Sequence, residues 1–271
     1  MPHTATVYRW ELRKLVAQKR TYLGLAAATI APTIFVAALA LQSGAPGDVP
    51  FGQYVRDTGL AAPLVLLTFG SIWLFPLIAS LVAGDIVAAE DGNGTLKTIL
   101  TRSVTRGQLF AAKVGAAATY ALLAIVAMAV VSLTEATIAW GFNPITSLSG
   151  TTVSAWRGLA LVAASLGVYA LPLLAITAIG VLLSTVTRNS AGAVVGALMT
   201  ALLMQLIGIL PGVGSIKPYL LTTQFDAWHG FLRTPIDWAP ITRGVWVSAI
   251  YAAVALASAY LVFLRRDVAG G

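Results

Sequence analysis

The fold of this chain is decided by a polar stretch between two long apolar runs: Asp85-Ile-Val-Ala-Ala-Glu-Asp-Gly-Asn-Gly-Thr-Leu-Lys-Thr-Ile-Leu-Thr-Arg-Ser-Val-Thr-Arg106. Together with Lys113, this stretch carries seven of the chain's 27 charged residues. The runs on either side carry few charges, as segments that cross a bilayer do. A membrane chain keeps such a charged segment for water, or for a partner in water.

The composition excludes most soluble classes of protein. Of the 271 residues, 58% are hydrophobic and 10% are charged, and the mean hydropathy is +0.85. A soluble domain is roughly 25% charged, so most of this surface faces lipid. We expect a single transmembrane domain over residues 1–271. The chain has no cysteine and two histidines, so we expect no disulfide and no metal site. The basic residues flank apolar runs, which argues against a nucleic-acid partner.

The N-terminal residues 6–20 are predicted to form an amphipathic helix at the membrane interface. Helical spacing places Tyr8, Leu12, Leu15 and Val16 on one face. Glu11 is three residues from Lys14, the spacing at which opposite charges pair on a helix.

Six membrane spans follow, predicted at residues 22–41, 60–83, 114–140, 159–183, 191–210 and 245–264. Pro63 and Pro76 are expected to bend the second span. If the N-terminus is cytoplasmic, 12 Lys and Arg residues lie on the inner side and 5 on the outer side. The positive-inside rule therefore predicts that both termini and the segment 85–113 are cytoplasmic. The outer segment 211–244 is rich in aromatic residues, and part of it is expected to re-enter the membrane or lie flat.

The polar stretch itself allows two interpretations. Residues 91–94 have the composition of a turn, and Thr95 is a plausible N-cap for a helix that runs to Arg102. On that helix Leu96, Ile99 and Leu100 form a small apolar patch with a charged rim. Such a helix suits a groove on a soluble partner, although an ordinary solvated loop has the same composition.

A resemblance favours the first interpretation. Residues 89–106 look like the signature of the ATP-binding-cassette (ABC) type-2 permeases. In that family an acidic residue, a Gly-Thr-Leu step, a Val-Ser/Thr-Arg step and a downstream Lys follow the second span. The matching residues are Glu90, Gly94, Thr95, Leu96, Leu100, Val104, Thr105, Arg106 and Lys113. The family's usual Pro before Val104 is replaced here by Ser103. The segments 10–15 and 263–268 also resemble the family's N-terminal helix and C-terminal finish.

The resemblance implies an all-α integral membrane protein of the bacterial cell membrane, with an interfacial helix and six transmembrane helices. Its partners would be a second permease copy or close paralogue and two cytoplasmic ABC ATPase subunits, with segment 85–113 coupling them. The implied coupling residues are Glu90, Asp91, Gly94, Thr95, Leu96, Lys97, Ile99, Leu100, Arg102 and Arg106. The chain has no phosphate-binding loop of its own. We therefore expect no enzymatic activity in this chain, with ATP and Mg²⁺ bound by the ATPase.

Polar or flexible side chains inside spans are the candidates for a substrate path. They are Thr68, Ser71, Glu135, Met199, Met204 and Gln205. The alternatives are that the hydroxyl groups bond back to their own helix and that Glu135 reaches the outer headgroups. Gly192 and Gly196 have the spacing that allows close helix approach.

The function expected from the resemblance is ATP-driven export of an amphiphilic or hydrophobic compound, such as a drug, antibiotic, peptide or lipid. An intramembrane enzyme is a poorer fit, because the spans hold neither a His-Glu-x-x-His motif nor paired Asp residues. A membrane anchor, scaffold or sensor for an ATPase complex is the remaining alternative.

Overall fold

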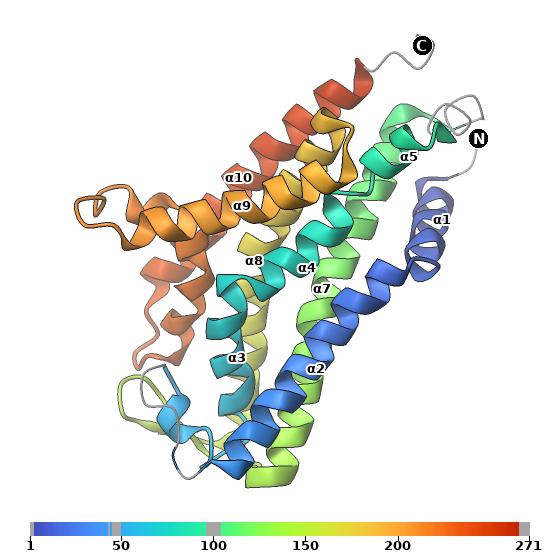
Figure 1. Ribbon diagram of the computed structural model, residues 1–271. Helices are drawn as coiled ribbons and strands as arrows, with labels where there is room; N and C mark the ends of the chain where they lie inside the picture. Colours follow the sequence, from blue (N-terminus) through green and yellow to red (C-terminus); the bar gives the residue numbers. More distant parts are fainter. Residues whose placement is uncertain (1–2, 43, 45–49, 96–103, 266–271) are drawn as a thin grey trace.

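The computed structural model describes residues 3–42, 44, 50–95 and 104–265, and this part of the chain is a bundle of α-helices (Figure 1). The helices are α1 (Thr4–Val16), α2 (Lys19–Leu41), α3 (Ala61–Ile72), α4 (Leu74–Ala83), α5 (Ala88–Gly92), α7 (Arg106–Trp140), α8 (Ala155–Thr187), α9 (Ser190–Ile209) and α10 (Trp238–Leu264). The shorter elements are the 3-10 helices η1 (Gly52–Tyr54), η2 (Lys217–Tyr219) and η3 (Thr222–Leu232), and the antiparallel strands β1 (Ile145–Thr146) and β2 (Thr152–Val153).

The prediction of an all-α membrane protein is confirmed at the level of its helices. Among the described residues, five helices are long and apolar enough to cross a membrane: α2, α7, α8, α9 and α10. If the bent pair of α3 and α4 is counted as one further span, the total is six. Large apolar side chains such as Leu23, Ile34 and Ile138 are exposed, as expected of a surface that faces lipid. The chain is therefore a multi-pass membrane protein.

Several helices are longer than the apolar runs that predicted them. The third span begins at Arg106 rather than at residue 114, because Thr105 and Gln108 form a capping box at its start. The last helix begins at Trp238 rather than at residue 245, with the Asp237 side chain accepting a hydrogen bond from the Ala239 amide. Hydropathy locates the apolar part of a helix, whereas capping residues set its end.

The second span is broken rather than gently bent. Its two halves, α3 and α4, meet at Trp73, and the axes of the pair differ by 62°. Pro76 explains the position of the break, because it has no amide hydrogen to donate to the carbonyl of Ile72, four residues earlier. Pro63 lies in the first turn of α3, where the missing amide hydrogen costs no helical hydrogen bond.

The N-terminal helix packs with a face that only partly matches the predicted one, because Leu15 is buried and Tyr8 and Leu12 pack against the core. Val7, Glu11 and Leu15 are buried on α1, whereas Val16 is 62% exposed. The helix ends at Val16, and α2 begins at Lys19. The predicted pairing of Glu11 with Lys14 is confirmed, and the spacing argument did not predict that ion pairs described below stabilise Glu11 in a buried position.

The segment 211–244 contains η2, η3 and the beginning of α10. The helix η3 packs against α8 and α10, and its Phe225 and Trp228 are buried. Phe225 lies 4.9 Å from Tyr169 of α8 between ring centroids. The β1–β2 hairpin, which was not predicted, links α7 to α8.

Candidate functional site

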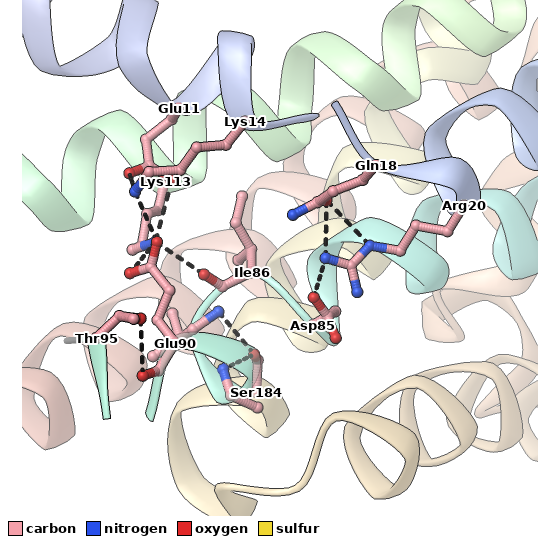
Figure 2. A network of polar contacts seen from close by, with 12 residues as sticks. Glu11, Lys14, Gln18, Arg20, Asp85, Ile86, Glu90, Thr95, Lys113 and Ser184 are labelled. Carbon is pink, nitrogen blue, oxygen red and sulfur yellow. Dashed lines mark hydrogen bonds and ion pairs between the residues drawn. The ribbon is translucent and has the colours of Figure 1, made fainter. Parts of the chain in front are cut away.

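Four charged side chains of alternating sign meet at one end of the bundle, and we call Glu11, Lys14, Glu90 and Lys113 the charge box (Figure 2). Lys113 Nζ lies 2.7 Å from Glu90 Oε2 and 3.1 Å from Glu11 Oε2. Lys14 Nζ lies 2.7 Å from Glu11 Oε1 and 2.7 Å from Glu90 Oε1. Each lysine thus bridges both carboxylates, and the box joins α1, α5 and α7.

Lys113 is the most deeply buried member, with a side chain that is 0% exposed. It lies two turns into α7 on the same face as the buried Leu109, Ala116 and Ala117. Its ammonium group also donates a hydrogen bond of 2.9 Å to the carbonyl of Ile86. Lys113 therefore donates hydrogen bonds to Glu11 and to the Ile86 carbonyl and forms an ion pair with Glu90. An ammonium group is tolerated at such a position only when it is paired in this way.

The other lysine of the box remains charged over the physiological range. Burial lowers the pKa of Lys14, but the carboxylates of Glu11 and Glu90 outweigh this effect, and the net shift is upward from 10.5. Because the pKa is raised in the folded protein, the stabilisation from Lys14 is fully present below the unfolded value. It is lost only as the pH rises through the folded value. The contribution of Lys14 to the box is therefore intact at neutral pH.

A second polar contact lies beside the box, at the turn between α4 and α5. Asp85 forms an ion pair with Arg20 of α2 and accepts a hydrogen bond from the hydroxyl of Ser190, at the start of α9. The amide oxygen of Gln18 orients the Arg20 guanidinium by accepting from Nε at 3.1 Å and from Nη2 at 2.8 Å. Asp85 thus links the beginnings of α2 and α9 to the end of the second span.

The start of α5 is held by α8. Ser184 Oγ accepts hydrogen bonds from the amides of Val87 and Ala88 at 3.1 and 3.0 Å, as an N-cap supplied by another helix (Figure 2). The packing beneath this turn is close, because a Cβ atom on Gly84 would lie 2.6 Å from the backbone nitrogen of Val194. Residues 84–88 therefore connect the second span to α5 through contacts with α8 and α9.

The predicted coupling residues fall into three groups. Glu90 faces inward, with a side chain that is 15% exposed. Gly94 and Thr95 are exposed, and Gly94 has a φ of +68°, which suits glycine in the predicted turn. The predicted apolar patch lies outside the described residues, as do its charged neighbours: Leu96, Lys97, Ile99, Leu100 and Arg102.

Two further coupling candidates make contacts within the chain. Asp91 Oδ2 lies 3.7 Å from Nε of Arg188, in the turn between α8 and α9. Arg106 Nη1 donates a hydrogen bond of 2.6 Å to the carbonyl of Leu264, at the C-terminal end of α10. A guanidinium at a helix C-terminus also interacts favourably with the helix dipole. Contact of these residues with a separate ATPase stays a prediction.

The substrate-path candidates lie on α3, α7 and α9. Thr68 donates to Leu64 O at 3.4 Å and Ser71 donates to Thr68 O at 2.8 Å, so both hydroxyls bond back to their own helix. Glu135 Oε1 accepts a hydrogen bond of 2.7 Å from Thr33 of α2. On α9, Met199 is exposed, and Met204 and Gln205 are partly buried. Of these three residues, only Glu135 is joined to another helix by its hydrogen bond, and the bonds of Thr68 and Ser71 stay within α3.

Gly192 and Gly196 of α9 do not form one continuous face that is open to another helix. A Cβ atom on Gly196 would lie 3.1 Å from Leu183 Cδ1 of α8, whereas Gly192 adjoins its own cap, Asn189. At least one of the two glycines therefore serves packing within this chain.

The sequence pointed to Glu90 and Lys113 but not to the full set of charges around them. The sequence feature that indicated further charged partners was Lys113 itself. It is a single lysine at helical spacing from Leu109 and Ala116, so it lies on the same helix face as these apolar residues. A lysine on a buried face requires nearby carboxylates, and Glu11 is one of ten acidic residues in the chain. No comparable local pattern in the sequence indicates the contacts of Asp85 with Arg20 and Ser190.

The fold and the site together define a multi-pass α-helical membrane protein whose charged segment after the second span is tied into the bundle. A family model described as "Protein of unknown function (DUF2705)" matches residues 30–269, so the chain belongs to this family. The match includes Glu90 and Lys113 and begins after Glu11 and Lys14. No curated protein matches this chain.

Proposed function

We propose that this chain is the permease subunit of an ATP-driven transporter with type-2 ABC exporter architecture, and that it exports an amphiphilic or hydrophobic compound. The observation that carries the proposal is the charge box, because it fixes the segment after the second span to both α1 and α7. The sequence resemblance of residues 89–106 to the permease signature supports the same conclusion.

The geometry gives this segment a mechanical role. A partner that displaces α5 also pulls on Lys14 of α1 and Lys113 of α7, because Glu90 bonds to both lysines. Helix α7 contains 35 residues and runs from the box to the opposite end of the bundle (Figure 1). A rigidly connected element of this kind can bias a membrane protein between two states.

The proposed complex contains two cytoplasmic ATPase subunits that bind ATP and Mg²⁺, and a second permease copy or close paralogue. The excess of Lys and Arg on one side, 12 against 5, supports a cytoplasmic position for both termini and for the charge box. The proposed location is the bacterial cell membrane.

The first test is purification of the tagged protein from its native host in a mild detergent, followed by mass spectrometry of the proteins that accompany it. A stoichiometric ATPase with its own phosphate-binding loop is the expected result. Absence of such a subunit in several detergents and in nanodiscs would overturn the proposal and favour a non-transporting membrane anchor, scaffold or sensor.

A matched pair of variants tests the contact surface. Thr95→Arg places a bulky charge on an exposed residue of the proposed contact, whereas Ala17→Arg places one on the exposed turn between α1 and α2. We expect Thr95→Arg to reduce the recovered ATPase about tenfold, a loss of ~1.4 kcal/mol in binding, and Ala17→Arg to leave it unchanged. Equal recovery from both variants would exclude this segment as the contact.

A further inference from the structure

A cavity of about 540 Å³ lies at the other end of the bundle from the charge box. It is lined by the β1–β2 hairpin, the beginning of α8, the end of η3 and the loop that leads into α10. Cavities that bind small molecules commonly have volumes of roughly 300–1,000 Å³. None of the predicted substrate-path residues lines it.

The polar part of the cavity carries positive charge. Arg157 and Arg233 both line it, and no acidic residue does. Arg233 pairs with Asp237, whose Oδ2 lies 3.6 Å from Arg233 Nη1, and the side chains of Arg233 and Asp237 are 58% and 37% exposed. An exposed pair of this kind contributes little stability, so Asp237 does not hold the Arg233 side chain firmly in place. The other oxygen of Asp237 accepts a hydrogen bond from the Ala239 amide.

The backbone adds to this positive potential. Ser154 is the N-cap of α8 and lines the cavity, but its side chain makes no capping hydrogen bond. Trp238, the first residue of α10, also lines the cavity. The N-terminal end of a helix carries a partial positive charge and amide groups that favour an anion. The uncapped start of α8 and two guanidinium groups thus surround one space, whereas the Asp237 carboxylate already caps the start of α10.

The remaining wall is apolar and aromatic. Leu161, Phe231, Ile236 and Trp238 line it, and the rings of Phe231 and Trp238 meet edge to face with centroids 5.8 Å apart. Tryptophan is enriched where a protein meets the headgroup zone of a bilayer. The combination of an anion-binding wall and an apolar wall fits an amphiphile better than a free inorganic anion.

The walls are held together by hydrogen bonds between distant segments. The amide of Leu148 donates to the carbonyl of Leu232 at 2.8 Å, and the amide of Thr234 donates to Ser149 Oγ at 2.9 Å. Thr151 Oγ1 donates to Thr234 Oγ1 at 3.0 Å. The hairpin is therefore fixed to the loop before α10, and the cavity is formed before any ligand arrives, which lowers the cost of binding.

We propose that this cavity binds the phosphodiester headgroup of an anionic membrane lipid, with Arg157 and Arg233 contacting the phosphate and Phe231 and Trp238 contacting the glycerol and the first acyl carbons. Arginine suits this role because its planar guanidinium can donate two parallel hydrogen bonds to a phosphate. The inference goes beyond the proposed transport function and does not depend on an ATPase partner.

Native mass spectrometry of the full chain in detergent tests this proposal. The protein is mixed with equal amounts of phosphatidylglycerol and phosphatidylcholine of matched acyl chains, and the ratio of the two bound lipids is measured. Wild type is expected to prefer phosphatidylglycerol, and the double variant Arg157→Gln/Arg233→Gln is expected to lose about tenfold or more of that preference. Thermal unfolding of both proteins establishes that the variant is folded.

The control variant is Lys217→Gln, which removes an exposed positive charge near η3 that does not line the cavity. It is expected to keep the wild-type preference. An unchanged preference in the double variant, or an equal loss in Lys217→Gln, would overturn the proposal.

Inorganic phosphate distinguishes a lipid headgroup from a free anion. We expect millimolar phosphate to leave the phosphatidylglycerol preference of wild type intact, because the apolar wall contributes to lipid binding. Displacement of the lipid by millimolar phosphate, together with phosphate binding that the double variant loses, would assign the cavity to a free anion and refute the lipid proposal.

Discussion

Replacement of Lys113 by methionine removes one charge from the centre of the charge box and keeps a side chain of similar length. Glu11 and Glu90 then share Lys14 as their only lysine within the box. At an effective dielectric constant of ~20, the contact of 2.7 Å with Glu90 is worth about 6 kcal/mol of Coulomb attraction, and that of 3.1 Å with Glu11 about 5 kcal/mol. Desolvation of the ammonium group offsets much of this attraction.

The net loss expected from breaking a buried ion pair is ~3–5 kcal/mol. At about 2–4 °C per kcal/mol, we expect the Tm of Lys113→Met in detergent to fall by roughly 6–20 °C, as measured by thermal unfolding with fluorescence detection. Lys19→Met is the control, because Lys19 lies at the same end of the bundle and is exposed. It should leave the Tm unchanged.

The double variant Lys113→Met/Glu90→Gln sharpens the test. It removes one charge of each sign and leaves the Glu11–Lys14 pair, whose atoms lie 2.7 Å apart. We therefore expect the double variant to be less destabilised than the sum of the two single variants by about 2 kcal/mol. Strict additivity, or a Tm of Lys113→Met equal to that of Lys19→Met, would refute the assignment of the box as a coupled set of ion pairs.

Three further substitutions test the contacts around the box. Ser184→Ala removes the cap from the start of α5 and should cost ~1 kcal/mol, measured as a lower Tm and faster hydrogen exchange of the α5 amides. Gly84→Ala places a methyl group 2.6 Å from a backbone nitrogen of α9 and should cost ~1–3 kcal/mol, whereas Gly92→Ala, with no atom within 4 Å, should cost less than 1 kcal/mol by the same thermal assay. Arg106→Gln removes a charge-assisted hydrogen bond to the end of α10 and should cost ~1.5–3 kcal/mol, with increased proteolysis of the C-terminal residues as a second readout.

Hydropathy was sufficient to predict the order of the long apolar helices, because a lipid-facing surface excludes charge along whole helices. It was insufficient for their ends and breaks, which depend on single residues. The capping box at Thr105 and the missing amide hydrogen of Pro76 are local features that can be recognised in a sequence. The 62° bend between α3 and α4 cannot, because its size depends on what packs against both halves.

The candidate site was predictable only in part, because its contacts join residues far apart in the chain. Glu90 attracted attention through its place in a polar segment, whereas Glu11 was predicted only to pair with its near neighbour Lys14. The charge box places Glu11 next to Lys113, which is 102 residues away. Such a pairing reveals itself only when the helices are assembled, and the face of α1 that is buried follows from the pairing.

The length of α7 has a consequence for the depth at which the charges sit. From Trp140 back to Lys113 the helix rises about 40 Å, at ~1.5 Å per residue, whereas the hydrocarbon core of a bilayer is ~30 Å thick. With Trp140 at one boundary of that core and α7 near the bilayer normal, Lys113 lies about 10 Å beyond the other boundary, among the headgroups. Protein atoms bury the Lys113 ammonium group at a depth where the surrounding headgroup zone is polar. In this arrangement the length of α7 places the ion pairs outside the acyl chains. In a thicker bilayer the same ion pairs would lie closer to the hydrocarbon core.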